Sequence, residues 1–458
     1  MGGNRRVLIV GGGFSGILAA KDLKWAFDVT IVDAKDFFEY TPGILRAFVK
    51  PSHFDALSFS LQGVIEKKVG VKFIWGEVKG IDGDKCTAMI KPRWKETPEE
   101  LAFDYCIICS GCNFNFLHKW GESLWFPTIY EEARPHSNWK HLDERTIEGR
   151  RRHIWEEYNK IKGLAEKNAK ILVCGAGFIG VEWATELQYF FPSLQLTIID
   201  FLPNCLGPLP VDAQNYCDKY MRSKGINTVY GVKYEPNSPE FWKKIGLPNG
   251  ADETYICMGV KASNYFMPKE TLSDKGPGGG GWILVNKKLQ VTTKDGKPWG
   301  KGTVFAVGDC NFGCVGGPND WVPGGKGIPP IPKISYPGEE QAHHAAVNVK
   351  SLDYQAHGDP GGLFSLCVPS KMMDTWWPWG AGMFATSLGP KDACFVLGAN
   401  STPGSGMLFL WGWTSVILKE FLEASIVDAK KGGLVCQLIW YFVHHTPIHL
   451  WGDGACWK

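Results

Sequence analysis

The sequence predicts an α/β fold in which one strand–turn–helix–strand unit occurs twice, followed by a small α+β domain at the C-terminal end. Three observations support this prediction. The 458 residues suffice for about three domains. Two segments, beginning at Arg6 and at Lys170, have the same pattern of apolar runs and glycines. From about residue 366 onward the chain becomes rich in tryptophan.

Each of the two units begins with an apolar strand and ends at an aspartate. The first has a strand at residues 6–10, the turn Gly11-Gly12-Gly13-Phe14-Ser15-Gly16, a helix to about Ala26 and a strand at residues 29–33. The second has a strand at residues 170–174, the turn Gly175-Ala176-Gly177-Phe178-Ile179-Gly180, a helix to about Phe190 and a strand at residues 196–200. Both units therefore match the dinucleotide-binding fingerprint.

The spacing of the glycines has a physical reason. The first glycine makes the tight turn, the second lets the backbone approach a pyrophosphate, and the third lets the helix pack closely on the strand. An acid about 20 residues further on binds a ribose hydroxyl. Asp33 follows Gly11 by 22 residues, and Asp200 follows Gly175 by 25. Two dinucleotide sites in one chain suggest a relay between a flavin and a nicotinamide nucleotide.

Three further motifs follow in a recognisable order. They are residues 103–111, ending in Cys109-Ser110-Gly111, residues 255–259, ending at Gly259, and the apolar strand at residues 302–309 that ends in Gly308-Asp309. With these motifs the chain resembles the two-dinucleotide-binding-domain flavoproteins. The resemblance implies two Rossmann-like FAD/NAD(P)-binding domains of the glutathione-reductase-like fold. It implies FAD at the Asp33 unit, with Asp309 on the ribityl hydroxyls, and NADH at the Asp200 unit.

The resemblance also implies domain boundaries and cofactor-binding residues. The FAD domain would comprise residues 1–125 and 299–365, the NADH domain residues 126–298, and a C-terminal cap residues 366–458. The residues expected to bind the cofactors are Gly11, Gly13, Phe14, Ser15, Gly16, Asp33, Ala34, Lys35, Arg46, Val78, Cys109, Ser110, Gly111, Gly175, Gly177, Gly180, Asp200, Gly259, Gly308, Asp309 and Tyr336.

The absence of a cysteine pair from residues 38–46 bears on the identity of the electron acceptor. Disulfide reductases of this fold have a CxxxxC pair there, and this chain has no cysteine in that stretch. Tyr40-Thr41-Pro42 with Arg46, and a helix beginning near Pro337, resemble type II NADH dehydrogenases and apoptosis-inducing-factor-like quinone reductases. The resemblance implies a quinone or another small acceptor. Glu340 and His344 replace the two glutamines of the bacterial AQxxxQ pattern.

The resemblance further implies two catalytic residues, Glu182 and Lys333. Glu182 would reach the space between nicotinamide and flavin, and Lys333 would stabilise the reduced flavin ring by its charge. The alternatives are a solvated carboxylate on a helix and a surface lysine. Asp200 favours NADH over NADPH, because its carboxylate repels a 2′-phosphate and Phe201-Leu202-Pro203 supplies no arginine.

Two other functions stay open at this stage. A sulfide:quinone oxidoreductase would use cysteines near the flavin, for which Cys310 and Cys314 are candidates, and an accessory flavoprotein would be a subunit of a larger assembly. Cys106, Cys109 and Cys112 have CxxC spacing, but residues three apart on a strand face opposite sides, so no metal site is expected. The charged segment 134–152 is interpreted as a solvated helix and linker.

Composition bears on partners and location. A net charge of +2 gives no basic field for nucleic acid. The 14 cysteines are mostly scattered singly, which favours an intracellular, reducing compartment.

No apolar run reaches the length of a membrane span. Peripheral contact with a mitochondrial or other organelle membrane is compatible with residues 407–418 and 434–445 and with several late tryptophans. The dinucleotide motifs are compatible with various quinones and with various oligomeric states. The late tryptophans are Trp376, Trp377, Trp379, Trp411, Trp413, Trp440, Trp451 and Trp457.

Overall fold

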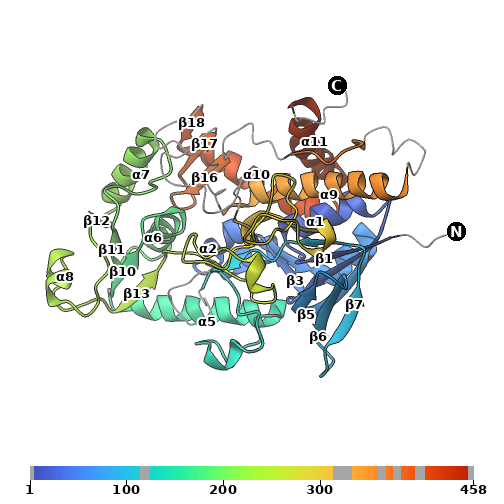
Figure 1. Ribbon diagram of the computed structural model, residues 1–458. Helices are drawn as coiled ribbons and strands as arrows, with labels where there is room; N and C mark the ends of the chain where they lie inside the picture. The colour runs from blue at the N-terminus through green and yellow to red at the C-terminus, as the bar shows by residue number, and fades with distance from the viewer. Residues whose placement is uncertain are drawn as a thin grey trace.

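The computed structural model describes residues 5–113, 124–312, 333–358, 368–374, 383–397 and 408–451. These residues form an α/β fold with two sheets rich in parallel pairs and a third, antiparallel sheet (Figure 1). The predicted α/β class is confirmed, and the domain boundaries stay predictions. Trp376, Trp377, Trp379, Trp457, Cys314 and the loop at 313–332 lie outside the described residues.

The larger sheet has the strand order β15-β8-β1-β2-β5-β6-β7. Its parallel part consists of β1 (Arg6–Val10), β2 (Asp28–Asp33), β8 (Tyr105–Ile108), β15 (Val304–Ala306) and the start of β5 (Lys72–Asp82). The end of β5 pairs antiparallel with β6 (Thr87–Pro92), which pairs with β7 (Glu99–Ala102). Strand β15 follows the second unit in sequence but pairs with β8, so a late segment completes the first sheet.

The second sheet has the order β12-β11-β10-β13, and all its pairs are parallel. Its strands are β10 (Lys170–Cys174), β11 (Gln195–Asp200), β12 (Asn227–Tyr230) and β13 (Glu253–Ile256). In both sheets the first strand of the unit has the second strand of the unit on one side and a strand from later in the chain on the other: β1 lies between β2 and β8, and β10 lies between β11 and β13. Ligands bind at this reversal of strand order in open α/β sheets. Both glycine turns lie there.

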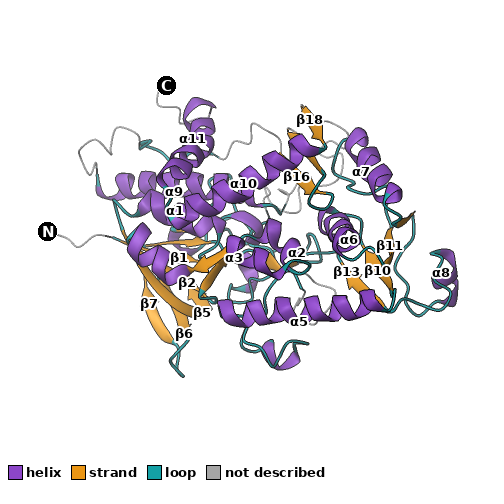
Figure 2. Ribbon diagram, turned by 180° about the vertical axis from the view of Figure 1, so that it is seen from behind, coloured by secondary structure: helices purple, strands orange, loops and turns teal. Residues whose placement is uncertain are grey.

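The helices of the first part of the chain surround these sheets. Helix α1 (Phe14–Leu23) packs against α9 (Ser335–His357), and α5 (Ile147–Glu166) extends along the lower side from the second sheet to the first (Figures 1 and 2). The predicted helix to Ala26 ends at Leu23, because Ala26 and Phe27 both donate to the Leu23 carbonyl as the chain turns into β2. The helices before α9 are α1 (Phe14–Leu23), α2 (Ile44–Ala47), α3 (Phe54–Leu57), α4 (Leu61–Val64), α5 (Ile147–Glu166), α6 (Phe178–Phe190), α7 (Val211–Ser223) and α8 (Pro239–Lys244).

The C-terminal part contains the third sheet and two helices. Strands β16 (Met383–Ser387), β17 (Ala393–Leu397) and β18 (Leu408–Trp411) pair antiparallel. Helices α10 (Trp413–Lys431) and α11 (Leu434–Trp451) pack against each other, and α11 also contacts α9. Two short pairings complete the described strands: β3 (Phe37–Glu39) with β4 (Ser58–Ser60), and β9 (Cys112–Asn113) with β14 (Lys261–Ala262).

Candidate functional site

A cavity of about 710 Å³ lies at the carboxyl ends of the central strands of the first sheet. Its wall includes residues of both glycine-turn units, of the segment 125–130, of α9 and of α10. Seventeen of the residues predicted to be functional line it. They are Gly11, Gly13, Phe14, Ser15, Asp33, Ala34, Lys35, Val78, Cys109, Ser110, Gly111, Glu182, Gly259, Gly308, Asp309, Lys333 and Tyr336.

The two glycine turns have nearly the same local geometry. Gly11 has φ of 106° and Gly175 has φ of 103°, a region that L side chains rarely adopt. A Cβ atom on Gly16 would stand 1.8 Å from the Gly11 carbonyl oxygen, and a Cβ on Gly180 would stand 1.8 Å from the Gly175 oxygen. Glycine is therefore required at these positions for the turn and for close packing, as the sequence spacing predicts.

Both turns lead into a helix whose first N–H groups have no side-chain cap. The caps of α1 and α6 are Gly13 and Gly177, in extended conformation, and neither helix has an acid in its first turn. A Cβ on either glycine would meet nothing within 4 Å. Uncapped donors, a positive helix end and open space together fit the phosphates of a dinucleotide.

Each aspartate at the end of the second strand binds its own glycine turn. Asp33 accepts hydrogen bonds from the N–H groups of Gly12 at 2.6 Å and Lys35 at 2.7 Å. Asp200 accepts equivalent bonds from Ala176 at 2.6 Å and Leu202 at 2.9 Å. Asp33 lines the large cavity. Asp200 does not, and neither do Gly16, Gly175, Gly177 and Gly180.

Glu182 is a buried cavity residue, so a solvated carboxylate on the helix face is excluded. Its side chain comes from the second turn of α6, and its carboxylate Oε1 accepts a 2.8 Å hydrogen bond from the Ser387 N–H. The same oxygen forms an ion pair with the Lys419 ammonium of α10. Lys419 also lines the cavity, and no local pattern in the sequence indicates a partner 237 residues away.

Lys333 is partly buried and lines the cavity, which argues against the alternative of an open surface lysine. Its ammonium donates to the Asn311 carbonyl and lies 4.5 Å from the centre of the Trp282 ring. Burial lowers the pKa of Lys333, and Asp309 partly offsets this effect. Burial likewise raises the pKa of Asp309 to about 6, against the opposing effect of Lys333. The pair places a cation and a carboxyl group beside each other at the cavity wall.

Arg46 lies away from the large cavity. Its guanidinium pairs with Glu186 of α6 at 2.9 Å and with Glu420 of α10 at 3.6 Å. It lines a second, much smaller cavity between these elements. Arg46 therefore joins α2 to α6, and its role as a cofactor-binding residue stays a prediction.

The cysteines at the site are poor candidates for nucleophiles. Burial, strengthened by neighbouring groups, raises the pKa values of Cys109 and Cys112 well above the usual range, and burial raises that of Cys310 to about 11. Thiols with raised pKa values stay protonated near neutral pH. In the described part of the chain, no group of three or more His, Cys, Asp or Glu side chains could hold a metal ion.

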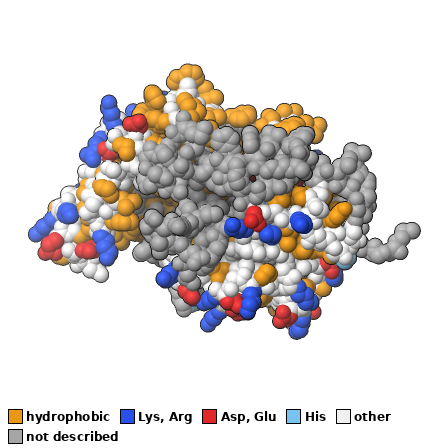
Figure 3. All heavy atoms as spheres, turned by 45° about the horizontal axis from the view of Figure 1, so that its top comes forward, with side chains coloured by type: hydrophobic (Ala, Val, Ile, Leu, Met, Phe, Trp, Pro, Cys, Tyr) orange, Lys and Arg blue, Asp and Glu red, His pale blue; other side chains and the backbone are white. Residues whose placement is uncertain are grey.

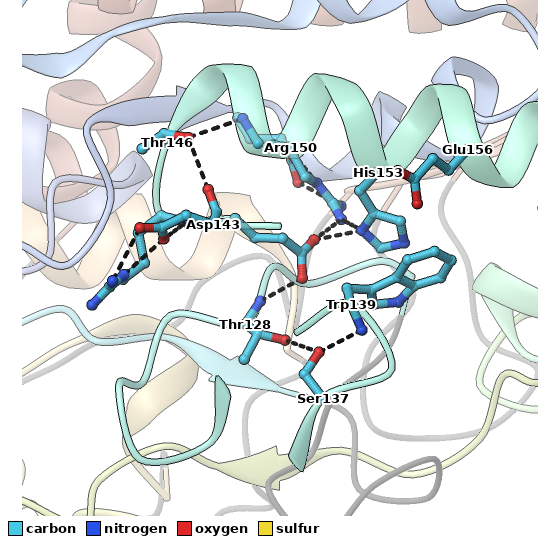
Figure 4. A network of polar contacts seen from close by, with 12 residues as sticks. Thr128, Ser137, Trp139, Asp143, Thr146, Arg150, His153 and Glu156 are labelled. Atoms are coloured by element: carbon cyan, nitrogen blue, oxygen red, sulfur yellow. Dashed lines mark hydrogen bonds and ion pairs between the residues drawn. The ribbon is translucent and has the colours of Figure 1, made fainter. Parts of the chain in front are cut away.

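A buried ionic network adjoins the cavity wall and contradicts the predicted solvation of the segment 134–152 (Figure 4). The sequence predicts a solvated helix and linker for the segment 134–152, but Arg150 is fully buried and pairs with Glu39 at 2.9 Å and Glu144 at 3.1 Å. His153 lies 2.5 Å from Glu144 and is covered by the Trp139 ring. Glu39 lines the cavity, so the network joins the cavity wall to α5.

The network also fixes the segment that closes one side of the cavity. Glu144 accepts a hydrogen bond from the Thr128 N–H at 3.1 Å, and residues 125–127, 129 and 130 line the cavity. A helical stripe on α5, formed by Arg150, His153, Glu157 and Ile161, is wholly buried. The helical spacing of these four residues is the sequence feature that could have predicted a buried face of α5. Its charged members argue against that prediction, since charged residues are rarely buried unless paired.

Several curated proteins are similar to this chain. Apoptosis-inducing factor homolog B of Dictyostelium discoideum is 35% identical over 334 residues, covering 67% of this chain and 74% of that protein. Ferroptosis suppressor protein 1 of Xenopus laevis is 27% identical over 320 residues, with the same coverage of 67% and 74%. Type II NADH:quinone oxidoreductase of Staphylococcus saprophyticus is 23% identical, covering 76% of this chain and 82% of that protein.

Solved structures with the same fold cover nearly the whole chain. Sulfide:quinone oxidoreductase from Aquifex aeolicus has a TM-score of 0.65 at 16% identity and covers 96% of each chain. NDH2 from Plasmodium falciparum, solved with NADH, has a TM-score of 0.63 at 12% identity, over 98% of this chain and 99% of that one. At these identities the likeness concerns the fold alone.

The family model described as pyridine nucleotide-disulphide oxidoreductase matches residues 5–346. This range includes both glycine turns, both aspartates and the Gly308-Asp309 motif. The resemblance stated from the sequence is confirmed by this match and by the relatives. The chain belongs to the pyridine nucleotide-disulphide oxidoreductase family.

Proposed function

We propose that this protein is an FAD-dependent oxidoreductase that takes hydride from NADH and passes electrons to a quinone. One observation supports this proposal above the others. Glu182, in the helix of the second glycine-turn unit, and the flavin-binding motifs of the first unit line the same cavity. A nicotinamide held by the second unit and a flavin held by the first would therefore meet there.

The chain's own residues fit the task of holding the two cofactors. Bound FAD would supply a ring that accepts hydride and gives up electrons. The uncapped N–H groups at the start of α1 would bind its phosphates, and Asp33 would bind its ribose, as its place at the cavity permits. Asp309 and Lys333 would lie along the rest of the cofactor, and α6 would present the nicotinamide from the opposite side.

The reaction needs orientation and exclusion of water more than it needs a covalent group. Phe178 and Ile179, at the start of α6, line the cavity together with Phe384 of β16. The Phe178 and Phe384 rings are stacked with centroids 5.3 Å apart. These apolar side chains can hold a flat ring in one orientation, and the ion pair of buried Glu182 with partly buried Lys419 adds a fixed charge pattern beside it.

Quinone-dependent oxidation of NADH tests this function. Purified protein loaded with FAD should oxidise NADH in the presence of a soluble quinone, with one quinol formed for each NADH consumed. Oxidation of NADH that is no faster with quinone than without it would contradict the proposal.

The nucleotide should be NADH. The carboxylate of Asp200 lies at the end of β11, followed by exposed Phe201 and Leu202, so it repels a 2′-phosphate with no arginine beside it. We expect kcat/KM for NADH to exceed that for NADPH by at least about tenfold, which corresponds to about 1.4 kcal/mol. Steady-state rates with the two nucleotides measure this ratio, and equal values would show that Asp200 does not select the nucleotide.

The protein should also bind lipid surfaces. Exposed apolar side chains gather on α10 and α11, and Figure 3 shows hydrophobic groups along the upper edge of the molecule. Among the described residues, no helix has the length and hydropathy of a membrane span. An amphipathic surface of this kind suits the lipid interface, where quinones reside. The exposed side chains are Trp413, Ile417, Phe421, Leu434, Val435, Leu438, Ile439, Tyr441, Phe442 and Val443.

Flotation with liposomes measures this attachment. The unmodified protein should float with neutral vesicles, and the triple variant Ile417→Glu, Phe421→Glu, Phe442→Glu should stay in the dense fraction. The double variant Trp25→Glu, Trp94→Glu changes exposed apolar side chains elsewhere and serves as the matched control. Equal flotation of the triple variant would exclude this surface.

The two alternatives have less support. A sulfide:quinone oxidoreductase needs reactive thiols at the flavin, whereas the pKa values of the cavity cysteines are raised and Cys310 is buried. Loss of the flavin absorption on adding sulfide without NADH would support the sulfide:quinone oxidoreductase hypothesis instead. A purely accessory role would leave unused the two intact glycine turns and their aspartates.

A further inference from the structure

A buried cluster of ionisable side chains lies where α9, α10 and α11 meet. Glu339 and Glu340 come from α9, Lys430 from α10 and His444 from α11, and all four are buried. The Lys430 ammonium pairs with Glu339 and donates to the Phe14 carbonyl at 2.9 Å. The hydride-transfer step derived above uses none of these four side chains.

His444 lies between the two carboxylates. Its Nδ1 is 2.7 Å from Oε1 of Glu340, and its Nε2 is 3.7 Å from Oε2 of Glu339. The Trp440 ring is stacked on one side at 5.5 Å, and the Tyr336 ring lies 5.7 Å away. An imidazolium has a donor on each nitrogen, so the protonated form faces an acceptor on both sides.

The cluster holds more acidic than basic side chains around His444. Two carboxylates face one ammonium, Lys430, which leaves one negative charge to be balanced. Lys21 of α1 lies nearby and donates to the Ala429 carbonyl at 2.7 Å. Burial and the charge of Lys430 lower the pKa of Lys21 to about 7, so its own charge is only partly present at neutral pH. Unbalanced buried charge is costly, and protonation of His444 neutralises it.

The cluster is in contact with the cavity. Glu339, Tyr336 and Trp440 are lining residues, and so are Leu422 and Ile426 of α10. The opposite side of α11 faces solvent, where Tyr441 and Phe442 are exposed. His444 therefore occupies a position between the end of the cavity beside α10 and α11 and the exterior of the protein.

Reduction of a quinone at this cavity requires a proton from the protein. A quinone becomes a quinol by taking up two electrons and two protons. NADH supplies both electrons and one proton as hydride, so the second proton comes from water. The overall reaction, NADH plus H⁺ plus quinone giving NAD⁺ plus quinol, is balanced only with that proton.

We propose that His444 delivers this proton through Glu339, so that the cluster is the proton supply for the reduction proposed above. Nε2 and Oε2 of Glu339, 3.7 Å apart at rest, first approach to hydrogen-bond distance. The N–H bond at Nε2 then breaks as the proton passes to Oε2 of Glu339, and from there it passes to the quinone oxygen. Water then reprotonates the imidazole. Glu340 holds the other nitrogen and keeps the ring turned toward Glu339, which makes it a positioning residue. The inference rests on the proposed quinone reductase function.

Comparison of two electron acceptors tests the proposal. Ferricyanide takes electrons without protons, whereas a quinone needs one from the protein. We expect His444→Gln to lower kcat with quinone by about 10²-fold, the usual contribution of a positioned acid, and to leave the ferricyanide rate within about twofold. His343→Gln is the matched control, because His343 is a buried histidine of α9 that pairs with Asp22 at 2.6 Å.

The pH profile separates proton delivery from a structural effect. The quinone rate of the unmodified enzyme should fall at high pH, because the imidazolium is the donor. That pH dependence should be lost in His444→Gln. An equal fall in the ferricyanide and quinone rates would overturn the proposal.

A measurement without turnover gives a second readout. The ¹⁵N spectrum of histidine-labelled protein should show a doubly protonated imidazole signal at neutral pH that is absent from His444→Gln. A neutral His444 throughout the pH range of activity would overturn the proposal. If the quinone reductase function itself is wrong, the unmodified protein will reduce ferricyanide but not quinone, an outcome distinct from an unchanged acceptor ratio in His444→Gln.

Discussion

Replacing Arg150 by methionine is expected to lower the free energy of unfolding by about 3 to 5 kcal/mol. Arg150 is fully buried and pairs with Glu39 and Glu144, which are also buried. Methionine fills a similar volume, but it removes the positive charge that pairs with the two buried carboxylates. Urea unfolding followed by circular dichroism measures the change. A loss below about 1 kcal/mol would show that the network contributes little to stability.

The neighbouring residue provides the control. Arg151 is partly exposed and pairs with Asp55 and Glu148 on the surface. Exposed pairs typically contribute about 0 to 1 kcal/mol, so Arg151→Met should have a small effect. The two variants remove the same side chain from adjacent positions of α5, and their difference isolates burial.

The stability of the network should also depend on pH in a defined direction. Burial alone would raise the pKa of Glu144, but His153 and Arg150 outweigh it and lower the pKa from 4.5 to about 2. A lowered folded pKa means that this stabilisation is present above about pH 4.5 and is lost as pH falls toward 2. Arg150→Met should therefore unfold at a higher pH than the unmodified protein in an acid titration.

Replacing Glu182 by glutamine is expected to lower kcat/KM for quinone reduction by about 10² to 10³-fold, the range found when a preorganised polar group is removed from a reacting centre. Glutamine keeps the shape and can still accept from the Ser387 N–H. It removes the charge that faces Lys419. Steady-state kinetics measure the loss, and thermal unfolding and flavin content check that the protein stays intact.

A double-variant cycle tests the coupling of Glu182 with Lys419. Lys419→Met should reduce the rate in the same direction, and the combined variant should lose less than the sum of the two effects. Glu420→Gln is the matched control on α10, because its side chain is largely exposed. Unmodified rates of NADH oxidation with quinone in both Glu182→Gln and Lys333→Ala would contradict the catalytic assignments.

The local parts of the fold and site could be predicted from the sequence. Gly11, Gly16 and Asp33 lie within one strand–turn–helix–strand unit, and their positions follow from turn geometry and close packing. The same holds for the second unit. Such motifs need only neighbouring residues, so one sequence is sufficient to recognise them.

The remaining parts depend on contacts between distant segments. Lys419 reaches Glu182 across 237 residues, and His444 reaches Glu340 across 104. No spacing rule relates such pairs. Arg150 illustrates a second difficulty, because its charge predicts exposure while its place on the stripe of α5 predicts burial. Only its partners Glu39 and Glu144, from separate elements, decide the outcome.

The proposed function requires flavin and NADH to meet in the cavity shared by the two units. The most direct test is the visible absorption spectrum of the purified protein, recorded before and after anaerobic addition of NADH. We expect flavin bands that bleach with one equivalent of NADH and return when quinone is added. A protein that purifies without flavin bands and gains none on incubation with FAD, or whose bands do not respond to NADH, would contradict it.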